Sequence, residues 1–410
     1  MATFANSNTR VFYATQAVAV GAIGATGIVD SANTAPALAN NVAICHGLQS
    51  VGVDTNFNLE QAFELGQLSL YENIEDIPDI SVTMQKFLDG YTLLYHLGAS
   101  CDGDGAEITA TSTSLAARAD TRADIRMVIN ATTEEAVQDD DDAVTELYCS
   151  GAYISSVSYS IPTDGTCTED VTFVGNNKKW ITDDADAQLL LIDGVNGVDG
   201  VFTTSIFGDD KPAYSGVGTS DGGNVLRRDD VLTSGTTING YTTILPSIVE
   251  GVATDTANYT FGAGVARAVV NAGPLDPTKA HVQSFSCSVD LGRESINQLG
   301  SRTPYSRYVN FPTEVTSTLE VIAIAGDNVS AVETQRSNLS NHEIIVALKD
   351  STVLHLGKKN KVSSVTYGGG VAGGGNASIT YNFSNFNDMV VLHSGDPIAA
   401  GSYWNDAFPA

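Results

Sequence analysis

The sequence predicts an all-β chain, rich in strands and with only short helices, whose two halves are tandem and duplicated. Two observations support this fold class. Segments such as Ser155–Ile161 alternate small polar residues with apolar ones, as strands with one buried face do. Two stretches of the chain also recur later in the same order, and an internal repeat marks the unit from which a fold is built. The two domains are expected at residues 1–182 and 183–410.

The first repeated block predicts a strand, a long connection and a second strand in each half. Gln49–Pro78 and Gln283–Pro312 align without a gap, 234 residues apart (283 − 49). They read QSVGVDTNFNLEQAFELGQLSLYENIEDIP and QSFSCSVDLGRESINQLGSRTPYSRYVNFP, with Gln-Ser, Glu, Leu-Gly, Tyr and Pro at matching places. Each block then enters a strand-like segment, which begins at Ile80 in the first half and at Glu314 in the second.

The second repeated block predicts a hairpin in each half. Turn residues at Pro162–Gly165 separate the two strands of the first copy, and Gly368–Gly375 separates those of the second. A glycine-rich loop is able to cradle phosphate, but this one leads into a strand and no Lys-Ser/Thr follows it. A hairpin loop is therefore the better interpretation. The matched strand pairs are Ser155–Tyr159 with Ser363–Tyr367, and Val171–Phe173 with Ile379–Tyr381.

The connection between the strands Val51–Thr55 and Ile80–Phe87 has no clear structure of its own and is too apolar to remain in solvent. It is about 24 residues long, and connections of this length are usually functional. Short helices are expected at Leu88–Leu97 and at Asn58–Leu65. An exposed apolar segment indicates an interaction site, here another subunit. The candidate contacts between subunits are Phe57, Phe63, Leu65, Leu68 and Tyr71 in the first copy, and Leu299, Tyr305 and Phe311 in the second.

The composition excludes several classes of function. The 410 residues hold 48 acidic and 20 basic side chains, a formal net charge of −28, which argues against a stable nucleic-acid clamp. Hydrophobic residues at 42% are enough for a core. The segment Val11–Val29 resembles a signal peptide only loosely, and no strongly apolar run long enough to span a membrane is expected. The five cysteines are irregularly spaced and are expected to stay reduced.

No catalytic, metal-binding or cofactor-binding residue is predicted, and the chain is not expected to be an enzyme. The six histidines form no HExxH pair, and no Gly-x-Ser-x-Gly elbow occurs. Cys101–Gly105 resembles the start of a calcium loop but lacks its later acidic ligands. The pair Glu134-Glu135 and the run Asp139–Asp142 are expected to be solvated loops.

Several of these motifs together resemble the tail tube proteins of tailed bacteriophages, of the kind with a duplicated tube domain. The resemblance begins at Asn8–Phe12 and continues through Phe63–Gly66, Tyr71–Ile74 and Pro78–Thr83. Ser363–Tyr367 followed by Ser378–Phe383 is similar to the closing hairpin of that fold. The likeness covers both halves of the chain and is weakest between Trp180 and Val282.

The resemblance implies β-sandwich or barrel domains whose sheets join side by side in a ring. Rings of three chains with pseudo-sixfold symmetry, or alternatively of six chains, would stack into the tube that conducts the genome. The family's inter-ring connection corresponds to Asn56–Asp79 and Asp290–Thr313 here. The implied partners are the chain itself, the tail tip or baseplate, and terminator or sheath proteins. Double-stranded DNA would pass without stable binding, and no membrane is implied.

The same resemblance places the protein in the virion tail after synthesis in the host cytoplasm. The excess of acids predicts a negative lumen, lined by Asp and Glu from the sheet faces of both domains, because such a wall does not hold DNA by counterion release. Other virion proteins, such as a capsid decoration protein, remain an alternative, as does a secreted acidic adhesin or surface-layer module. A glycan-active enzyme is a more distant alternative with no residue to nominate.

Overall fold

Antiparallel strands build this protein in a computed structural model, whose described part holds one α-helix and one short 3-10 helix. The all-β prediction is therefore confirmed. The structure describes residues 16–22, 42–45, 47–66, 70–90, 93–99, 115, 122–130, 143–182, 225–233, 241–246, 256–261, 265–270, 281–300, 304, 306–322, 341–350, 352–369 and 376–392.

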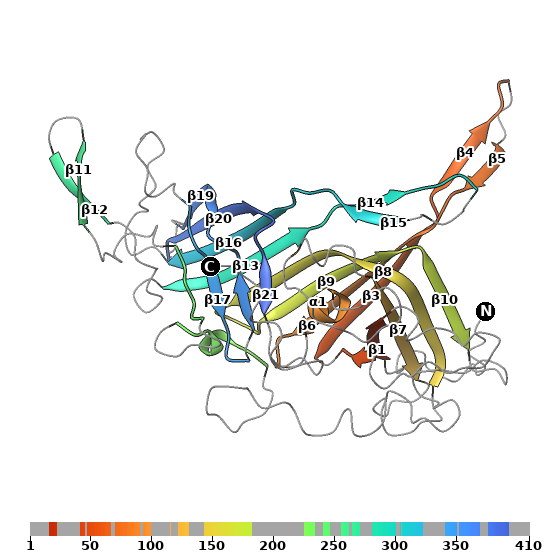
Figure 1. The fold of residues 1–410 in the computed structure, drawn as a ribbon, viewed down its shortest axis with the longest axis horizontal. Coiled ribbons are helices and arrows are strands. Elements are labelled where there is room, and N and C mark those ends of the chain that lie inside the picture. The colour runs from red at the N-terminus through yellow and green to blue at the C-terminus, as the bar shows by residue number, and fades with distance from the viewer. Residues whose placement is uncertain are drawn as a thin grey trace.

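Eight strands of a twelve-stranded sheet run side by side through both halves of the chain (Figure 1). All the neighbouring pairs are antiparallel. In spatial order the eight are β3 (Leu48–Asn56), β6 (Asp79–Phe87), β9 (Thr168–Gly175), β8 (Ala143–Pro162), β13 (Val282–Asp290), β16 (Glu314–Ile322), β20 (Ser378–Phe386) and β19 (Lys361–Gly368).

Strand β8 belongs to two parts of this sheet because it is 20 residues long. Its C-terminal half pairs with β9 and β13, whereas its N-terminal half pairs with β7 and β10. The remaining strands of the sheet are β7 (Ala123–Asn130), β1 (Gln16–Ala22), β2 (Val42–Ile44) and β10 (Asn177–Thr182).

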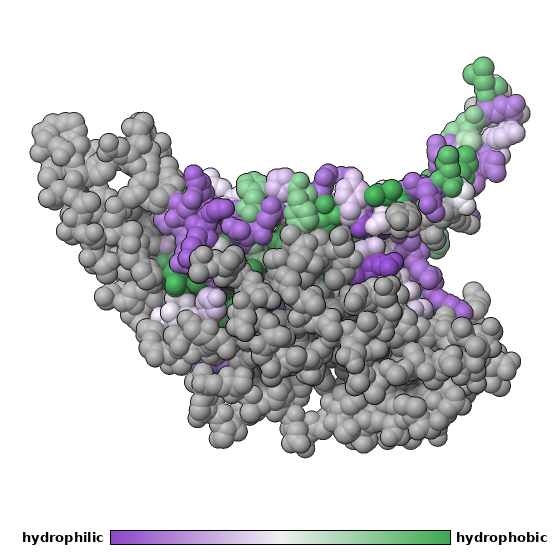
Figure 2. All heavy atoms as spheres, in the orientation of Figure 1, coloured by the Kyte–Doolittle hydropathy of each residue, from purple (hydrophilic) through white to green (hydrophobic). Residues whose placement is uncertain are grey.

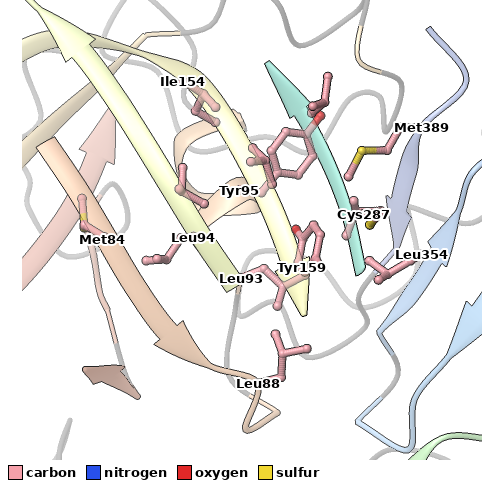
Figure 3. Close-up of a cluster of buried hydrophobic side chains, with 14 of the residues drawn as sticks. Met84, Leu88, Leu93, Leu94, Tyr95, Ile154, Tyr159, Cys287, Leu354 and Met389 are labelled. Carbon is pink, nitrogen blue, oxygen red and sulfur yellow. The ribbon is translucent and has the colours of Figure 1, made fainter. Parts of the chain in front are cut away.

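One face of the eight-stranded section is buried and the other is polar. Alternation along β6 puts Ile80, Val82 and Met84 into the core and leaves the residues between them facing outward. The short helix α1 (Leu94–Ala99) lies on the buried face, where Leu94 and Tyr159 join one hydrophobic cluster (Figure 3). That cluster contains residues of both halves, so the core is continuous across them.

The second half carries smaller sheets in addition. Strands β17 (Ile345–Ala347), β18 (Val353–His355) and β21 (Val390–Leu392) form one, and β11 (Thr256–Phe261) with β12 (Val265–Val270) forms another. The segment 225–233, which includes the 3-10 helix η4 (Arg228–Asp230), bridges the halves through its backbone. Leu226 donates to the Leu88 carbonyl, and the Asp230 carbonyl accepts from Lys349.

The strand order of the second half repeats that of the first. The first half runs β3, β6, β9, β8 and the second runs β13, β16, β20, β19. One irregularity recurs as well: the β3–β6 register shifts between Leu48 and Ser50, and the β13–β16 register shifts between Val282 and Ser284. The β8–β9 and β19–β20 ladders also share a register shift, next to Ser156 and Ser364 respectively.

The registers correct one part of the sequence alignment. Val171 lies opposite Met84 in β6, whereas Tyr381 lies opposite Leu319 in β16, and all four side chains are buried. Val171 therefore corresponds to Tyr381 and not to Ile379, a shift of two residues. The reason is that the chain between the paired positions is two residues longer in the second half. Tyr381 follows its partner Val365 by 16 positions (381 − 365), and Val171 follows its partner Val157 by 14 (171 − 157).

The long connections are β-hairpins, which the sequence analysis did not predict. The first arm is β4 (Leu59–Phe63) paired with β5 (Leu70–Glu75), and the second arm is β14 (Arg293–Ile296) paired with β15 (Ser306–Val309). The expected helix at Asn58–Leu65 is wrong, because Asn58 takes a left-handed conformation (φ 44°) that redirects the chain into a strand.

The helix expected at Leu88–Leu97 is shorter than predicted and begins later, at Leu94. Gly90 has φ 87°, a conformation that a right-handed helix does not contain, so the chain turns before α1 starts.

Candidate assembly surfaces

The ladder between β8 and β13, which we call the in-chain joint, connects the two halves of the sheet. It runs from Ser284 opposite Pro162 to Asp290 opposite Ser156. At its centre Tyr159 faces Cys287, and their exposed fractions are 1% and 2%. The joint is thus as well buried as the interior of either half.

The outer strands β3 and β19 lack a second neighbour among the described strands. Tyr367 holds the place in β19 that Tyr159 holds in β8, yet it is 63% exposed. Val53 in β3 is half-buried, whereas Cys287, its counterpart in β13, is buried. An open strand edge presents unpaired backbone groups to another chain. These two edges are therefore candidate surfaces for assembly.

The arms expose large apolar side chains to solvent. Figure 2 shows hydrophobic residues at the projecting first arm, clear of the body of the protein. The tips are the most exposed, since Leu65 and Leu299 are fully open and lie beside the left-handed Gly66 and Gly300. The other predicted contact residues that the structure describes are also exposed: Phe57 61%, Phe63 65%, Tyr71 67% and Phe311 41%. Leu68 and Tyr305 lie outside the described residues.

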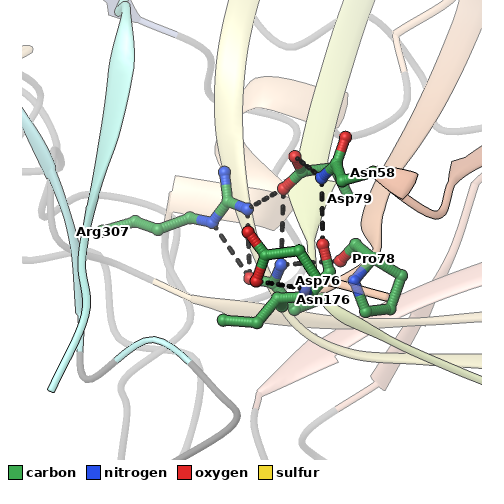
Figure 4. Close-up of polar contacts among 7 residues, drawn as sticks. Asn58, Asp76, Pro78, Asp79, Asn176 and Arg307 are labelled. Carbon is green, nitrogen blue, oxygen red and sulfur yellow. Dashed lines mark hydrogen bonds and ion pairs between the residues drawn. The ribbon is translucent and has the colours of Figure 1, made fainter. Parts of the chain in front are cut away.

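The second arm is fixed to the first half of the chain at its base (Figure 4). Arg307 in β15 donates to Asp79 at 2.6 Å and to Asn176 at 3.0 Å. Asn58 donates to the same Asp79 carboxylate. Partial burial alone would raise the pKa of Asp79, but the hydrogen bonds from Asn58 and Arg307 outweigh it and lower that pKa. Sequence reasoning missed this contact, because nothing in the local sequence links Arg307 to residues of the other half.

A second arginine strengthens the same contact, which we call the seat of the second arm: the surface of the first half on which the base of that arm lies. The Nε of Arg293 in β14 donates to the Ile154 carbonyl at 2.8 Å, and its guanidinium lies 5.0 Å from the centre of the Tyr153 ring. A cation placed over an aromatic face at this distance is attracted by the ring. Just before it, Leu291 is buried and its backbone amide donates to the Ser155 carbonyl.

The uncovered face of the eight-stranded section is acidic. Its residues are mostly Ser, Thr and Asn, which alternate along each strand with the buried positions. Lys361 is the one basic residue that the ladders place on this face within the eight strands. Its acidic residues are Asp54, Asp79, Asp170, Asp290, Glu314 and Glu320.

Buried charges lie where the halves meet, on the opposite face. Lys86 forms a 2.7 Å ion pair with Asp89, and Glu169 accepts from Tyr159 and from two backbone amides at the start of α1. Burial raises the pKa of Glu169. It also raises the pKa of Asp350 to about 6, helped by the nearby Asp89. These carboxylates are satisfied by protein donors, so they serve the fold.

The histidines, cysteines and acidic motifs considered from the sequence form no metal-binding group in the described part of the chain. No group of three or more His, Cys, Asp or Glu there is placed to hold a metal ion. His355 is buried, which lowers its pKa to about 4. Cys45, Cys149, Cys167 and Cys287 are buried free thiols whose pKa burial raises. Cys101–Gly105, Glu134-Glu135, Asp139–Asp142, Asn8–Phe12, His46 and His393 lie outside the described residues.

None of the described helices has the length and apolar character needed to cross a membrane. No protein-family model and no curated protein matches the sequence. Among solved structures, one match is a sheath-tube complex of an extracellular contractile injection system (PVC) in its extended state. It is 14% identical with a TM-score of 0.25, over 41% of this chain and 88% of that one.

Another match is the tube-terminating cap of the anti-feeding prophage. It is 11% identical with a TM-score of 0.26, over 45% of this chain and 100% of that one. Scores of this size do not assign a function, which has to come from the geometry.

Proposed function

We propose that this chain is the structural subunit of a phage tail tube, which polymerises as stacked rings and conducts the viral genome into the host. Three chains, each supplying two copies of the tube domain, form the ring with pseudo-sixfold symmetry; a ring of six chains is the alternative. The observation that carries the proposal is the strand order of the main sheet, in which the second half repeats the first and continues it through the in-chain joint.

The repeat supplies a pattern for the contact between chains. When β19 of one chain pairs with β3 of the next, the joint between β8 and β13 is reproduced. Transferring the register of that joint sets Val53 opposite Tyr367 and Asp54 opposite Thr366. Closing a sheet on itself removes both open edges, and this is how barrels avoid uncontrolled edge-to-edge association.

The arms account for the stacking of rings. Their tips carry Leu65 and Leu299, which no described part of the same chain covers. Burying an apolar side chain of this size stabilises a contact by roughly 1.5–3 kcal/mol. Several such side chains in each subunit, repeated around a ring, give a stable contact between successive rings.

The uncovered acidic face suits the lumen of the tube. In a closed ring the core face with α1 lies outside and the polar face lies inside. Six acidic residues lie on the polar face, and they outnumber Lys361 together with Arg307, which pairs with Asp79. Such a wall repels DNA phosphates. It also lacks a row of cationic side chains that would displace the counterions of the DNA, so the genome stays mobile. The proposal includes no catalytic residue, cofactor or stable DNA contact.

The remaining partners follow from the proposed role. The ends of the tube would contact the tail tip or baseplate and a terminator, and a sheath would surround it in a contractile tail. The protein would be made in the host cytoplasm and end in the virion tail.

Cross-linking in the predicted register tests the proposal. Cys101 is first replaced by Ser, because the other four cysteines are buried and Cys101 lies outside the described residues. In this background, Asp54→Cys with Thr366→Cys is expected to cross-link chains under oxidation, because directly opposed side chains lie about 5 Å apart. Ser50→Cys with Thr366→Cys is the matched control, since these positions stand four residues out of register. Electron microscopy of the same preparation is expected to show rings or tubes with a central channel. Absence of both the cross-link and the rings would overturn the proposed function.

A further inference from the structure

The two arms occupy equivalent places but differ in chemistry at their bases. In the hairpin ladders Asn73 faces Gln61 as Arg307 faces Ser295, and Leu59 faces Glu75 as Arg293 faces Val309. The turn entering each arm is also equivalent, with Asn58 at φ 44° and Gly292 at φ 50°.

The surface that Arg307 of the second arm contacts also has an equivalent in the second half of the chain. Arg307 contacts Asp79 and Asn176, which come from the adjoining ends of β6 and β9. In the second half, the corresponding ends of β16 and β20 hold Glu314 and Phe386, which face each other in the ladder. Phe386 is 56% exposed, so a large aromatic ring stands open where the first half has an asparagine.

The start of the first arm is apolar where the second arm is already buried. Phe57 takes the place of Leu291, and it is 61% exposed whereas Leu291 is 4% exposed. Leu59, in the place of Arg293, is also 61% exposed. The core of the same chain buries Leu291, because β13 is paired with β8. No described strand of the same chain lies beside β3 to cover Phe57 in this way.

We infer that the base of the first arm docks laterally on the C-terminal half of the next chain in the ring. Phe57 and Leu59 lie there as Leu291 and Arg293 lie on the first half, and Asn73 lies over Phe386 and Glu314. This inference rests on the proposed ring, since it takes the neighbouring chain from the β19–β3 pairing. It adds that the arm has two separate tasks, with its base binding within a ring and its tip reaching the next ring.

The difference in chemistry matches the second arm to the first half of its own chain and the first arm to the second half of the next chain. Arg293 and Arg307 of the second arm would meet Lys361 and Phe386 if that arm took the intermolecular seat, in place of Tyr153 and Asn176. Glu314, in the place of Asp79, would still offer Arg307 a carboxylate. The cation brought next to Lys361 and the loss of the carboxamide partner of Arg307 nevertheless disfavour that arrangement. The apolar base of the first arm meets no such penalty.

A second pair of cysteines tests the inference. In the Cys101→Ser background, Asn73→Cys with Phe386→Cys is expected to cross-link neighbouring chains. Glu72→Cys with Phe386→Cys is the matched control, because Glu72 lies on the opposite face of β5. The first pair should react at least about tenfold faster than the control, since docking raises the effective concentration of one partner near the other.

The outcomes separate this inference from the proposed function. If Asp54→Cys with Thr366→Cys cross-links and the Asn73/Phe386 pair reacts no faster than its control, the ring stands and the lateral seat is wrong. If neither pair cross-links, the ring fails and the seat fails with it. Cross-linking by both pairs, with the two controls slow, supports the seat. A Phe57→Asp chain that folds but no longer gives the Asn73/Phe386 cross-link would identify Phe57 as part of it.

Discussion

The in-chain joint and the open edges use the same strand positions in different surroundings. Tyr159 in β8 is 1% exposed because β13 lies beside it, and Tyr367 in β19 is 63% exposed because no described strand does. The two tyrosines follow the same Ser-Ser-Val pattern, so local sequence does not set their burial. What differs is the neighbouring strand. Each open edge is therefore equivalent to one of the two strands of the in-chain joint, with β3 in the place of β13 and β19 in the place of β8.

The largest expected effect comes from truncating these two tyrosines. Tyr159→Ala should destabilise the isolated chain by about 3–5 kcal/mol, because it empties a fully buried site. Tyr367→Ala should change the stability of the isolated chain by less than about 0.5 kcal/mol, as exposed positions do. Denaturant unfolding measures both. Equal losses in the two variants would break the comparison, because β19 would then be covered within the chain.

Charged substitutions at the arm tips should prevent polymerisation without unfolding the chain. Phe63→Asp and Leu299→Asp each remove an apolar side chain that is exposed in the isolated chain. Burying such a side chain on assembly would stabilise the contact by roughly 1.5–3 kcal/mol. Sedimentation and electron microscopy are expected to show soluble, folded protein without stacked tubes. A charge at an exposed position that takes no part in stacking, such as Thr316→Asp, is the control. Normal tubes from both arm variants would contradict the stacking role of the tips.

Asp350, which lies near Lys86 and Asp89 of the first half, should make the stability of the chain sensitive to pH. Its pKa in the folded chain is about 6, above the ordinary value of 3.8, so the folded state binds the proton more tightly. This group therefore costs stability as the pH rises from about 4 to about 6, by roughly 2 kcal/mol. Asp350→Asn does not titrate, and the stability difference between variant and parent should change by that amount across this window. A constant difference from pH 4 to pH 7 would exclude this origin.

The smallest expected effect is at the seat of the second arm. Arg307→Ala removes the ion pair with Asp79, and such partly exposed pairs stabilise by up to about 1 kcal/mol. The pKa of Asp79 is lowered, so this contribution is complete above its ordinary pKa and is lost as the pH falls through the folded one. Asn73→Ala in the first arm is the matched substitution and should leave the stability of the isolated chain unchanged. Comparable losses in both variants would mean that the first arm is seated without a second chain.

The sequence was sufficient for the elements whose signal is local. Alternation in Ser155–Ile161 predicted part of strand β8, because a half-buried strand has a residue period of two. The glycine-rich stretch before Ser378–Phe383 predicted a hairpin and with it strand β20. The repeated Gln-Ser and Leu-Gly located corresponding segments in the two halves. The apolar content of the first connection predicted burial against another subunit, and this stays a prediction; in the isolated chain its large hydrophobic side chains are exposed.

The features that sequence could not supply depend on contacts between distant residues. The pairing of Arg307 with Asp79 joins residues of different halves, and neither position has a local pattern that selects its partner. The arms were predicted as unstructured or helical because Asn58 and Gly66 act through backbone conformation, which the apolar pattern does not report. The two-residue shift at Tyr381 became visible only from the ladder register.

The two open edges of the eight-stranded section are unlike each other, since among the described strands β3 begins its order and β19 ends it. A contact between unlike surfaces is heterologous, and every molecule added to such a series leaves the same two edges free. In the proposed ring, growth in one plane then stops only when the curvature of the sheet brings the first edge back to the last. A small error in that curvature produces an open spiral in place of a closed ring. Substitutions that flatten or tighten the twist at the in-chain joint should therefore change the number of subunits per turn, even though they touch no surface between molecules.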